Sequence, residues 1–134
     1  MIVVDTNVLV YAVRPGKYTE AALSAKRKDP EWVAPAFWRL EMLNVLALSM
    51  RVEGLGPSLA AEAFSIAESL VSDLEFQPSH EETLALCQRS GISAYDAEFV
   101  LAAERLGAPL LTRDTGLLKA FPALTLSLPE FGAP

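Results

Sequence analysis

Short apolar runs alternate with longer stretches of mixed polarity along the chain. The first run, Ile2-Val3-Val4, is β-branched and predicts a buried strand that ends at Asp5. Further strands are predicted at residues 32–34, 74–76, 109–112 and 124–128. Strands that alternate with helical segments are typical of an α/β domain, so we expect a mostly parallel central sheet flanked by helices.

The longer stretches carry start and stop signals of helices. Ser79 with Glu82, and Ser93 with Asp96, form capping boxes, and Thr6 is expected to cap the first helix. Helices are predicted at residues 8–13, 18–28, 35–53, 80–89, 94–106 and 115–120, and another begins at Pro57. In that last helix the residues expected to face the core are Leu59, Ala63, Ile66 and Leu70.

Length and composition narrow the class of protein. The chain has 134 residues, and we expect residues 1–134 to form a single domain. Cys87 and His80 are its only cysteine and histidine, which excludes a disulfide framework and multi-histidine metal sites. The N-terminus lacks a signal peptide's basic region, and charged residues interrupt every apolar run. We therefore expect a cytoplasmic protein that does not enter a membrane.

The net charge of −6 disfavours binding to a nucleic acid, but the charges are unevenly distributed. Residues 14–28 carry five Lys or Arg and one Glu, whereas residues 52–88 carry seven acidic residues and no Lys or Arg. Such runs are also typical of solvated helix faces. The alternative interpretation is that one side of the molecule is basic and another is acidic.

Three aspartates lie where the predicted elements meet. Asp5 and Asp114 each follow a strand, at the edge of a parallel sheet where ligands bind. Either residue alone is explained as the N-cap of the segment that follows it. Asp96 is also explained as the third helical position behind Ser93, where a carboxylate favours the helix dipole.

Glu41 is harder to explain as a structural residue. Its helix is apolar nearly all round, which predicts that the helix is buried. An ionised carboxylate there needs a partner, and a salt bridge to Arg39 or Arg113 is one alternative. Metal coordination is the other. Four carboxylates gathered at one sheet edge would repel one another, and a hard cation such as Mg²⁺ or Mn²⁺ would relieve this.

Four segments together resemble the PIN-domain family, and most closely its VapC-type toxins. The segments are Ile2-Val3-Val4-Asp5-Thr6-Asn7, Arg39-Leu40-Glu41-Met42-Leu43-Asn44-Val45-Leu46, Ser93-Ala94-Tyr95-Asp96-Ala97 and residues 102–114, which end in Leu111-Thr112-Arg113-Asp114. They follow the family's order and cover nearly the whole chain. The resemblance implies a three-layer PIN-like fold with a cluster of acids at the strand ends.

The resemblance also implies the site residues and the activity. Asp5, Glu41, Asp96 and Asp114 match the family's catalytic acids, and Asp5, Asp96 and Asp114 would bind Mg²⁺, with Mn²⁺ as a substitute. Asn7 and Thr112 match supporting polar positions. The implied activity is Mg²⁺-dependent endoribonuclease cleavage of RNA that leaves a 5′-phosphate.

Partners follow from the same resemblance. A cognate antitoxin protein that covers the acids, as in a type II toxin–antitoxin pair, and a homodimer are implied. Arg14, Lys17 and Arg39 are candidates to bind the RNA backbone.

Two other functions are alternatives to a ribonuclease. One is a catalytically silent PIN-like module that binds RNA or protein. The second is a receiver-type phosphoacceptor domain, which needs an acid pair after the first strand and a lysine after a late one. This chain has Asp5 alone after the first strand, and Pro129 follows the last.

Overall fold

Five short strands form one sheet in the computed structural model, which describes all residues from 1 to 134. The strands are β1 (Ile2–Val4), β2 (Trp32–Ala34), β3 (Ser72–Asp73), β4 (Leu110–Thr112) and β5 (Thr125–Ser127). Their order is β3-β2-β1-β4-β5, and every neighbouring pair is parallel. The expected parallel sheet is confirmed, and the carboxyl ends of its strands share one edge.

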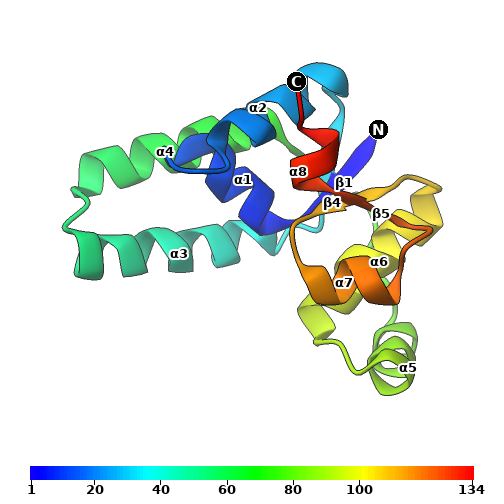
Figure 1. Cartoon of the computed structure of the whole chain (residues 1–134). Helices are drawn as coiled ribbons and strands as arrows, with labels where there is room; N and C mark the ends of the chain where they lie inside the picture. The colour runs from blue at the N-terminus through cyan, green and yellow to red at the C-terminus, as the bar shows by residue number, and fades with distance from the viewer.

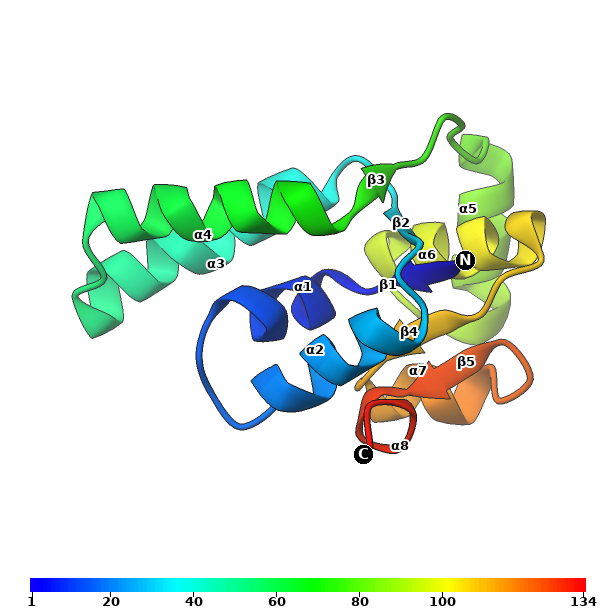
Figure 2. The same ribbon diagram turned by 90° about the horizontal axis from the view of Figure 1, so that it is seen from above.

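Eight helices surround this sheet (Figure 1, Figure 2). They are α1 (Thr6–Val13), α2 (Thr19–Lys28), α3 (Trp38–Glu53), α4 (Pro57–Leu70), α5 (His80–Ser90), α6 (Ala94–Leu106), α7 (Thr115–Ala120) and α8 (Leu128–Phe131). One layer contains α1, α2 and α8, and the opposite layer contains α5, α6 and α7. The hairpin of α3 and α4 extends beyond the sheet as an arm (Figure 1).

The core is built around the two central strands of the sheet. Val3, Val4, Leu110 and Leu111 have no exposed surface, because helices cover both faces of β1 and β4. Strands buried on both faces have no need for polar alternation, which explains their continuous apolar sequence. The acids that follow these strands are therefore attached to fully buried strands of the core.

Helix boundaries largely follow the polar signals in the sequence. The Ser79 hydroxyl accepts a hydrogen bond from the Glu82 amide at 3.2 Å, and the Ser93 hydroxyl accepts one from the Asp96 amide at 3.1 Å. The helix that Ser93 opens ends at Gly107, whose φ of 62° lies in the left-handed region that glycine favours. The predicted helix at residues 94–106 is confirmed.

Two helix starts differ from the prediction. The N-cap of α1 is Asp5 and not Thr6, because the Asp5 carboxylate accepts the hydrogen bond from the Asn7 amide. The helix expected from Pro35 begins instead at Trp38. Residues 35–37 form a turn, in which the Trp38 amide donates to the Pro35 carbonyl at 3.0 Å.

Two strand boundaries were also predicted wrongly. The edge strand expected at residues 74–76 lies at Ser72–Asp73, where it pairs with β2. The last strand stops at Ser127, and Leu128 begins the short helix α8. Pro129 lies in the first turn of this helix, where a missing amide hydrogen costs no intrahelical hydrogen bond.

The packing of α3 and α4 also corrects the prediction. The buried face of α4 is made of Ala60, Ala63 and Ala67, while Leu59 and Ile66 are exposed. Small side chains allow α4 to pack closely on α1 and α3. The expectation that α3 is buried is wrong as well. Many of its apolar side chains face outward: Leu40, Leu43, Leu48, Met50 and Val52.

No helix has the combination of length and apolar character that crossing a bilayer requires. Helix α3 has apolar side chains on two sides: one side, with Met42 and Leu46, is buried, and the other, with Leu43, is exposed. A surface of this kind usually marks a contact with another protein.

Candidate active site

The ends of β1 and β4 bring Asp5 and Asp114 together. The two strands are neighbours in the sheet, and Thr112 at the end of β4 connects the two acids. Its hydroxyl donates to Asp5 Oδ2 at 2.9 Å and accepts a hydrogen bond from the Asp114 amide at 3.0 Å. Thr112 is fully buried, so its position is fixed by the core.

Asp5 and Asp114 are also helix caps. Asp5 Oδ1 accepts the Asn7 amide at 3.4 Å at the start of α1, and Asp114 Oδ1 accepts the Leu117 amide at 3.0 Å at the start of α7. The capping explanation from the sequence is therefore correct for both residues. Capping occupies one oxygen of each carboxylate, so it does not compete with a role in a cluster.

Glu41 lies in the first turn of α3 and accepts a hydrogen bond from the buried Thr6 hydroxyl at 2.7 Å. This bond joins the start of α1 to the start of α3. The salt bridges considered for Glu41 are absent, since neither Arg39 nor Arg113 pairs with it. Its polar partner is a neutral hydroxyl, so no protein cation neutralises the Glu41 charge.

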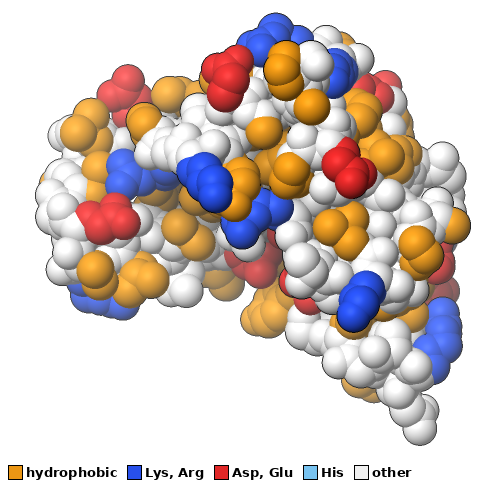
Figure 3. Space-filling model, viewed as in Figure 1, with side chains coloured by type: hydrophobic (Ala, Val, Ile, Leu, Met, Phe, Trp, Pro, Cys, Tyr) orange, Lys and Arg blue, Asp and Glu red, His pale blue; other side chains and the backbone are white.

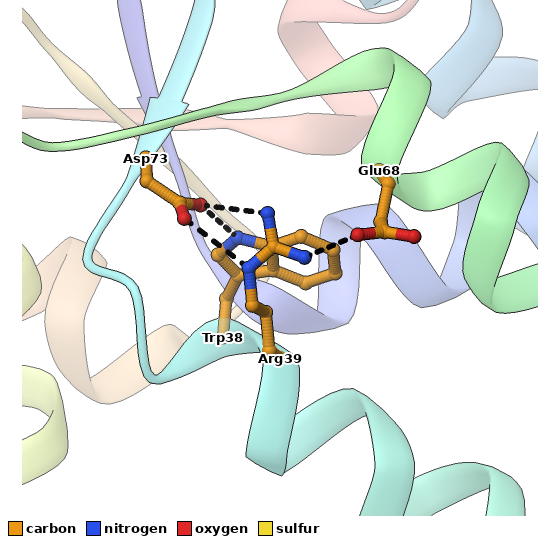
Figure 4. Close-up of polar contacts among 4 residues, drawn as sticks. All are labelled: Trp38, Arg39, Glu68 and Asp73. Carbon is orange, nitrogen blue, oxygen red and sulfur yellow. Dashed lines mark hydrogen bonds and ion pairs between the residues drawn. The ribbon is translucent and has the colours of Figure 1, made fainter.

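Arg39 faces away from Glu41, as expected for residues two positions apart on a helix. Its guanidinium forms ion pairs with Asp73, at 3.2 Å, and with Glu68. Figure 4 shows the guanidinium between these two carboxylates and over the ring of Trp38, whose indole nitrogen donates to Asp73 at 2.8 Å. Arg39 therefore connects α3 with α4 and β3.

Asp96 brings the fourth carboxylate from the opposite layer. It lies in the first turn of α6, which packs against β1 and β4. Burial raises the pKa of Asp96, and the charges of Asp5 and Asp114 raise it further, while the Ser93 hydroxyl lowers it. Repulsion of this kind is expected between carboxylates that lie near one another.

The pKa values of two other acids show the same mutual influence. Burial raises the pKa of Asp5 against the opposing effect of the Thr112 hydrogen bond, and the charge of Asp114 adds to the rise. Burial likewise raises the pKa of Glu41, and Asp5 and Asp96 add to it. Asp5, Glu41, Asp96 and Asp114, which we call the acid cluster, thus share one electrostatic environment.

The acid cluster fits a hard divalent cation by its chemistry. All four side chains offer carboxylate oxygens, which are the ligands that Mg²⁺ and Mn²⁺ prefer. Their mutual repulsion is the penalty that a bound dication would remove. In the present arrangement no three acidic side chains converge on a single ion position. Binding would therefore require rotation of at least one carboxylate.

The remaining residues predicted for the site lie in different surroundings. Asn7 lines a hollow of about 330 Å³ together with Asp5, Tyr11, Arg113, Asp114 and Thr115. Arg14 forms an ion pair with Glu53 at 2.7 Å, which joins the ends of α1 and α3. Lys17 is exposed and has no carboxylate partner. Of the three basic candidates, Lys17 alone is free of an ion pair.

Three residues at the site were not singled out from the sequence. Thr6 was interpreted as a helix cap, although its hydroxyl donates a hydrogen bond to Glu41. Gly116 leaves room for an acid, since a Cβ there would lie 3.0 Å from Asp114 Oδ1. Arg113 was considered only as a partner of Glu41. The sequence gives no signal for Gly116, because the contact depends on the tight turn into α7.

Comparison with known proteins identifies the family. The family model described as "PIN domain" matches residues 2–122. Ribonuclease VapC3 of Pyrobaculum aerophilum is 43% identical over 44 residues, which cover 33% of this chain. The match spans only 34% of that relative's length, about a third.

Solved structures share the fold over nearly the full length. PAE2754 from Pyrobaculum aerophilum superposes with a TM-score of 0.76 at 21% identity, over 99% of this chain and 96% of that one. VapBC2 from Rickettsia felis, bound to a DNA fragment from its promoter, superposes with a TM-score of 0.68 at 17% identity, over 95% and 98%. A toxin–antitoxin complex from Klebsiella pneumoniae gives 0.66 at 18% identity, over 96% and 98%. With its parallel sheet, its acid cluster and a family match over residues 2–122, this chain belongs to the PIN domain family.

Proposed function

We propose that the protein is an Mg²⁺-dependent endoribonuclease that hydrolyses RNA phosphodiester bonds. The observation that carries the proposal is the approach of four carboxylates, two that follow β1 and β4 and two in the first turns of α3 and α6, none of which forms an ion pair with a Lys or Arg side chain. Its membership of the PIN domain family and its likeness to a relative named as a ribonuclease support the same activity.

Each acid has a role in this proposal. Asp5, Asp96 and Asp114 bind Mg²⁺, for which Mn²⁺ can substitute. The bound ion would lower the pKa of a water molecule and offset charge on the phosphoryl oxygens. Glu41 either completes the coordination or accepts the proton of the attacking water, and the Thr6 hydroxyl orients it. Hydrolysis leaves a 5′-phosphate on one product and a 3′-hydroxyl on the other.

We also propose that the protein is the toxin of a type II toxin–antitoxin pair. Two of the similar structures are described as VapBC2 and as a toxin–antitoxin complex, which supports a protein partner. The cognate antitoxin would cover the acid cluster and so block the RNA. A homodimer would use a different surface, the exposed apolar side chains of α3 and α4.

The alternative is a PIN module that binds RNA or protein without cutting it. A matched pair of variants on α6 separates the two. Asp96→Asn removes a charge from the acid cluster, whereas Glu98→Gln removes one two residues later, where the carboxylate faces Thr83. The measurement is cleavage of single-stranded RNA with Mg²⁺, in which the wild type and Glu98→Gln should cut. Asp96→Asn should lose at least about a hundredfold in rate, in line with the loss of a group that acts on the reacting phosphate.

Two results would contradict the proposal. A wild-type protein that binds RNA but cuts none with Mg²⁺ or Mn²⁺ would favour the silent module. An Asp96→Asn variant as active as the wild type would show that the acid cluster is not the site of hydrolysis. Circular dichroism of both variants should match the wild type, which checks that the fold is intact.

A further inference from the structure

We infer that Arg113 binds a backbone phosphate of the RNA next to the acid cluster, held in position by Tyr11 and Tyr18. The inference rests on the proposed function, because it assigns a binding residue for that reaction's substrate. Arg113 follows β4 directly and precedes Asp114, so the chain places a cation beside one of the acids.

Two tyrosines hold the guanidinium. Its Cζ lies 3.9 Å from the centroid of the Tyr18 ring and 5.8 Å from that of Tyr11, and Nη1 donates to the Tyr11 hydroxyl at 2.9 Å. The two rings are themselves in contact, with centroids 5.2 Å apart. Tyr11 belongs to α1 and Tyr18 caps α2, so the turn between these helices supports the arginine. Stacking on aromatic faces stabilises a guanidinium and limits its motion.

The charge of Arg113 is not neutralised within the chain. It forms no ion pair, in contrast to Arg14, Arg27 and Arg39, each of which pairs with a carboxylate. A guanidinium has five N–H donors, and the hydrogen bond to Tyr11 uses one of them. The remaining donors form the planar fork that binds phosphate in a bidentate manner.

The position of Arg113 connects it with the proposed reaction. Arg113 lines the 330 Å³ hollow together with Asp5 and Asp114, which places the cation beside the proposed metal ligands. Lys17 adds a second cation, since its ammonium lies 5.5 Å from the centroid of the same Tyr18 ring. Figure 3 shows Lys and Arg side chains near the middle of this face, beside a recess that contains Asp and Glu.

Cations beside the acids offset the repulsion that a polyanion would meet there. Arg113 and Lys17 would bind backbone phosphates there and so hold the strand across the acid cluster. Neither residue touches the reacting atoms in this proposal. Arg113 is a binding and positioning residue, and it should affect substrate affinity more than the rate of the bound complex.

The test compares Arg113→Ala, Arg113→Lys and the control Arg27→Ala. The control removes an arginine that pairs with Glu20 on the exposed side of α2. The steady-state kinetics of RNA cleavage are measured at several salt concentrations. The binding of fluorescent RNA is measured separately in an Asp96→Asn background. We expect Arg113→Ala to raise KM and the RNA Kd on the order of tenfold, with kcat changed much less.

Salt dependence distinguishes a phosphate contact from a purely structural role. The loss of one contact to single-stranded RNA should lower the slope of log affinity against log salt by about 0.7. Arg113→Lys should retain the salt slope of the wild type, because it keeps the positive charge. Its affinity for RNA should be lower, because lysine lacks the planar fork of donors that binds phosphate. Arg27→Ala should match the wild type in KM, Kd and slope.

The outcomes for this inference and for the proposed function differ. Cleavage by Arg113→Ala with the KM and salt slope of the wild type overturns the inference and leaves the nuclease intact. If the wild type cuts no RNA but Arg113→Ala still binds RNA more weakly than the wild type, the nuclease proposal is overturned and the inference stands. An unchanged Kd together with weakened binding of a protein partner would assign Arg113 to that partner and also overturn the inference.

Discussion

Two buried threonine hydroxyls oppose the rise in the pKa of the acids to which they donate. Thr6 donates to Glu41, and Thr112 donates to Asp5, in each case to a carboxylate whose pKa is raised by burial. A hydrogen bond to the ionised form lowers the pKa and so opposes that rise. The threonines thus help to keep the acids ionised, which is the form that binds a cation.

Thr112→Val tests this role at the scale of one side chain. The variant removes the donor to Asp5 and leaves the Asp114 amide without its acceptor. We expect a loss of about 1–3 kcal/mol in the free energy of unfolding, measured by urea denaturation. Without the hydrogen bond the pKa of Asp5 rises further, so the acid limb of the pH–rate profile should move to higher pH.

A threonine on the neighbouring strand provides the control. Thr125 lies on β5, and its hydroxyl donates to the Phe121 carbonyl, not to an acid. Thr125→Val should leave the pH–rate profile in place, and Thr112→Ser should restore it. A Thr112→Val enzyme with the wild-type profile would show that the hydroxyl does not act on Asp5.

At the scale of elements, α3 shows how far the sequence can predict structure. Its end near Glu53 was predicted correctly, because glycine follows and its backbone φ is positive in the fold. Its burial was predicted wrongly, because periodicity records which residues are apolar but not which neighbours cover them. The same reason explains α4, where the alanines and not Leu59 or Ile66 face the core.

The exposed apolar side of α3 and α4 carries a prediction of its own. Leu43 lines an apolar hollow of about 560 Å³ between the two helices and is 48% exposed. We expect this surface to form the homodimer, so Leu43→Glu should shift the protein towards monomer in size-exclusion chromatography with light scattering. Homodimer interfaces are more apolar than the rest of a protein surface, and a buried charge there is costly.

Leu84→Glu on α5 is the matched control, since Leu84 is also exposed but lies away from the α3–α4 hairpin. It should leave the mass unchanged. A wild-type protein that is monomeric at every concentration, or a Leu43→Glu variant that stays dimeric, would contradict the predicted interface.

For the whole molecule, the acid cluster lowers the stability of the metal-free protein. In the unfolded chain carboxylates titrate near pH 4, whereas the raised pKa of Asp96 lets the folded state keep its proton to higher pH. Between the two pKa values the folded state binds more protons than the unfolded state. Stability therefore falls as the pH rises through this range, and the full penalty is present at neutral pH.

Asp96→Asn should accordingly stabilise the metal-free protein at pH 7. We expect an increase in Tm of about 3 °C, measured by calorimetry in EDTA, which disappears below about pH 4. Glu104→Gln is the control, because Glu104 lies on the exposed side of the same helix. An Asp96→Asn protein less stable than the wild type at pH 7 would show that the ionised carboxylate does not destabilise the fold.

The positions of the acids were more predictable than the positions of the cations. Asp5 and Asp114 follow strands, and the carboxyl ends of parallel strands must share an edge, so the topology determines where these acids lie. Long basic side chains can reach several partners. Arg39 was expected at the RNA but binds Asp73 and Glu68, a choice that depends on how α4 and β3 pack against α3.

Binding of a divalent cation by the acid cluster underlies the proposed activity, and titration calorimetry with Mn²⁺ at neutral pH measures it. The wild type and Glu98→Gln should show saturable binding, because their four acids are intact, whereas Asp96→Asn should bind at least about tenfold more weakly. Equal Mn²⁺ affinity in the wild type and Asp96→Asn, or no binding by the wild type, would show that the acid cluster is not a metal site.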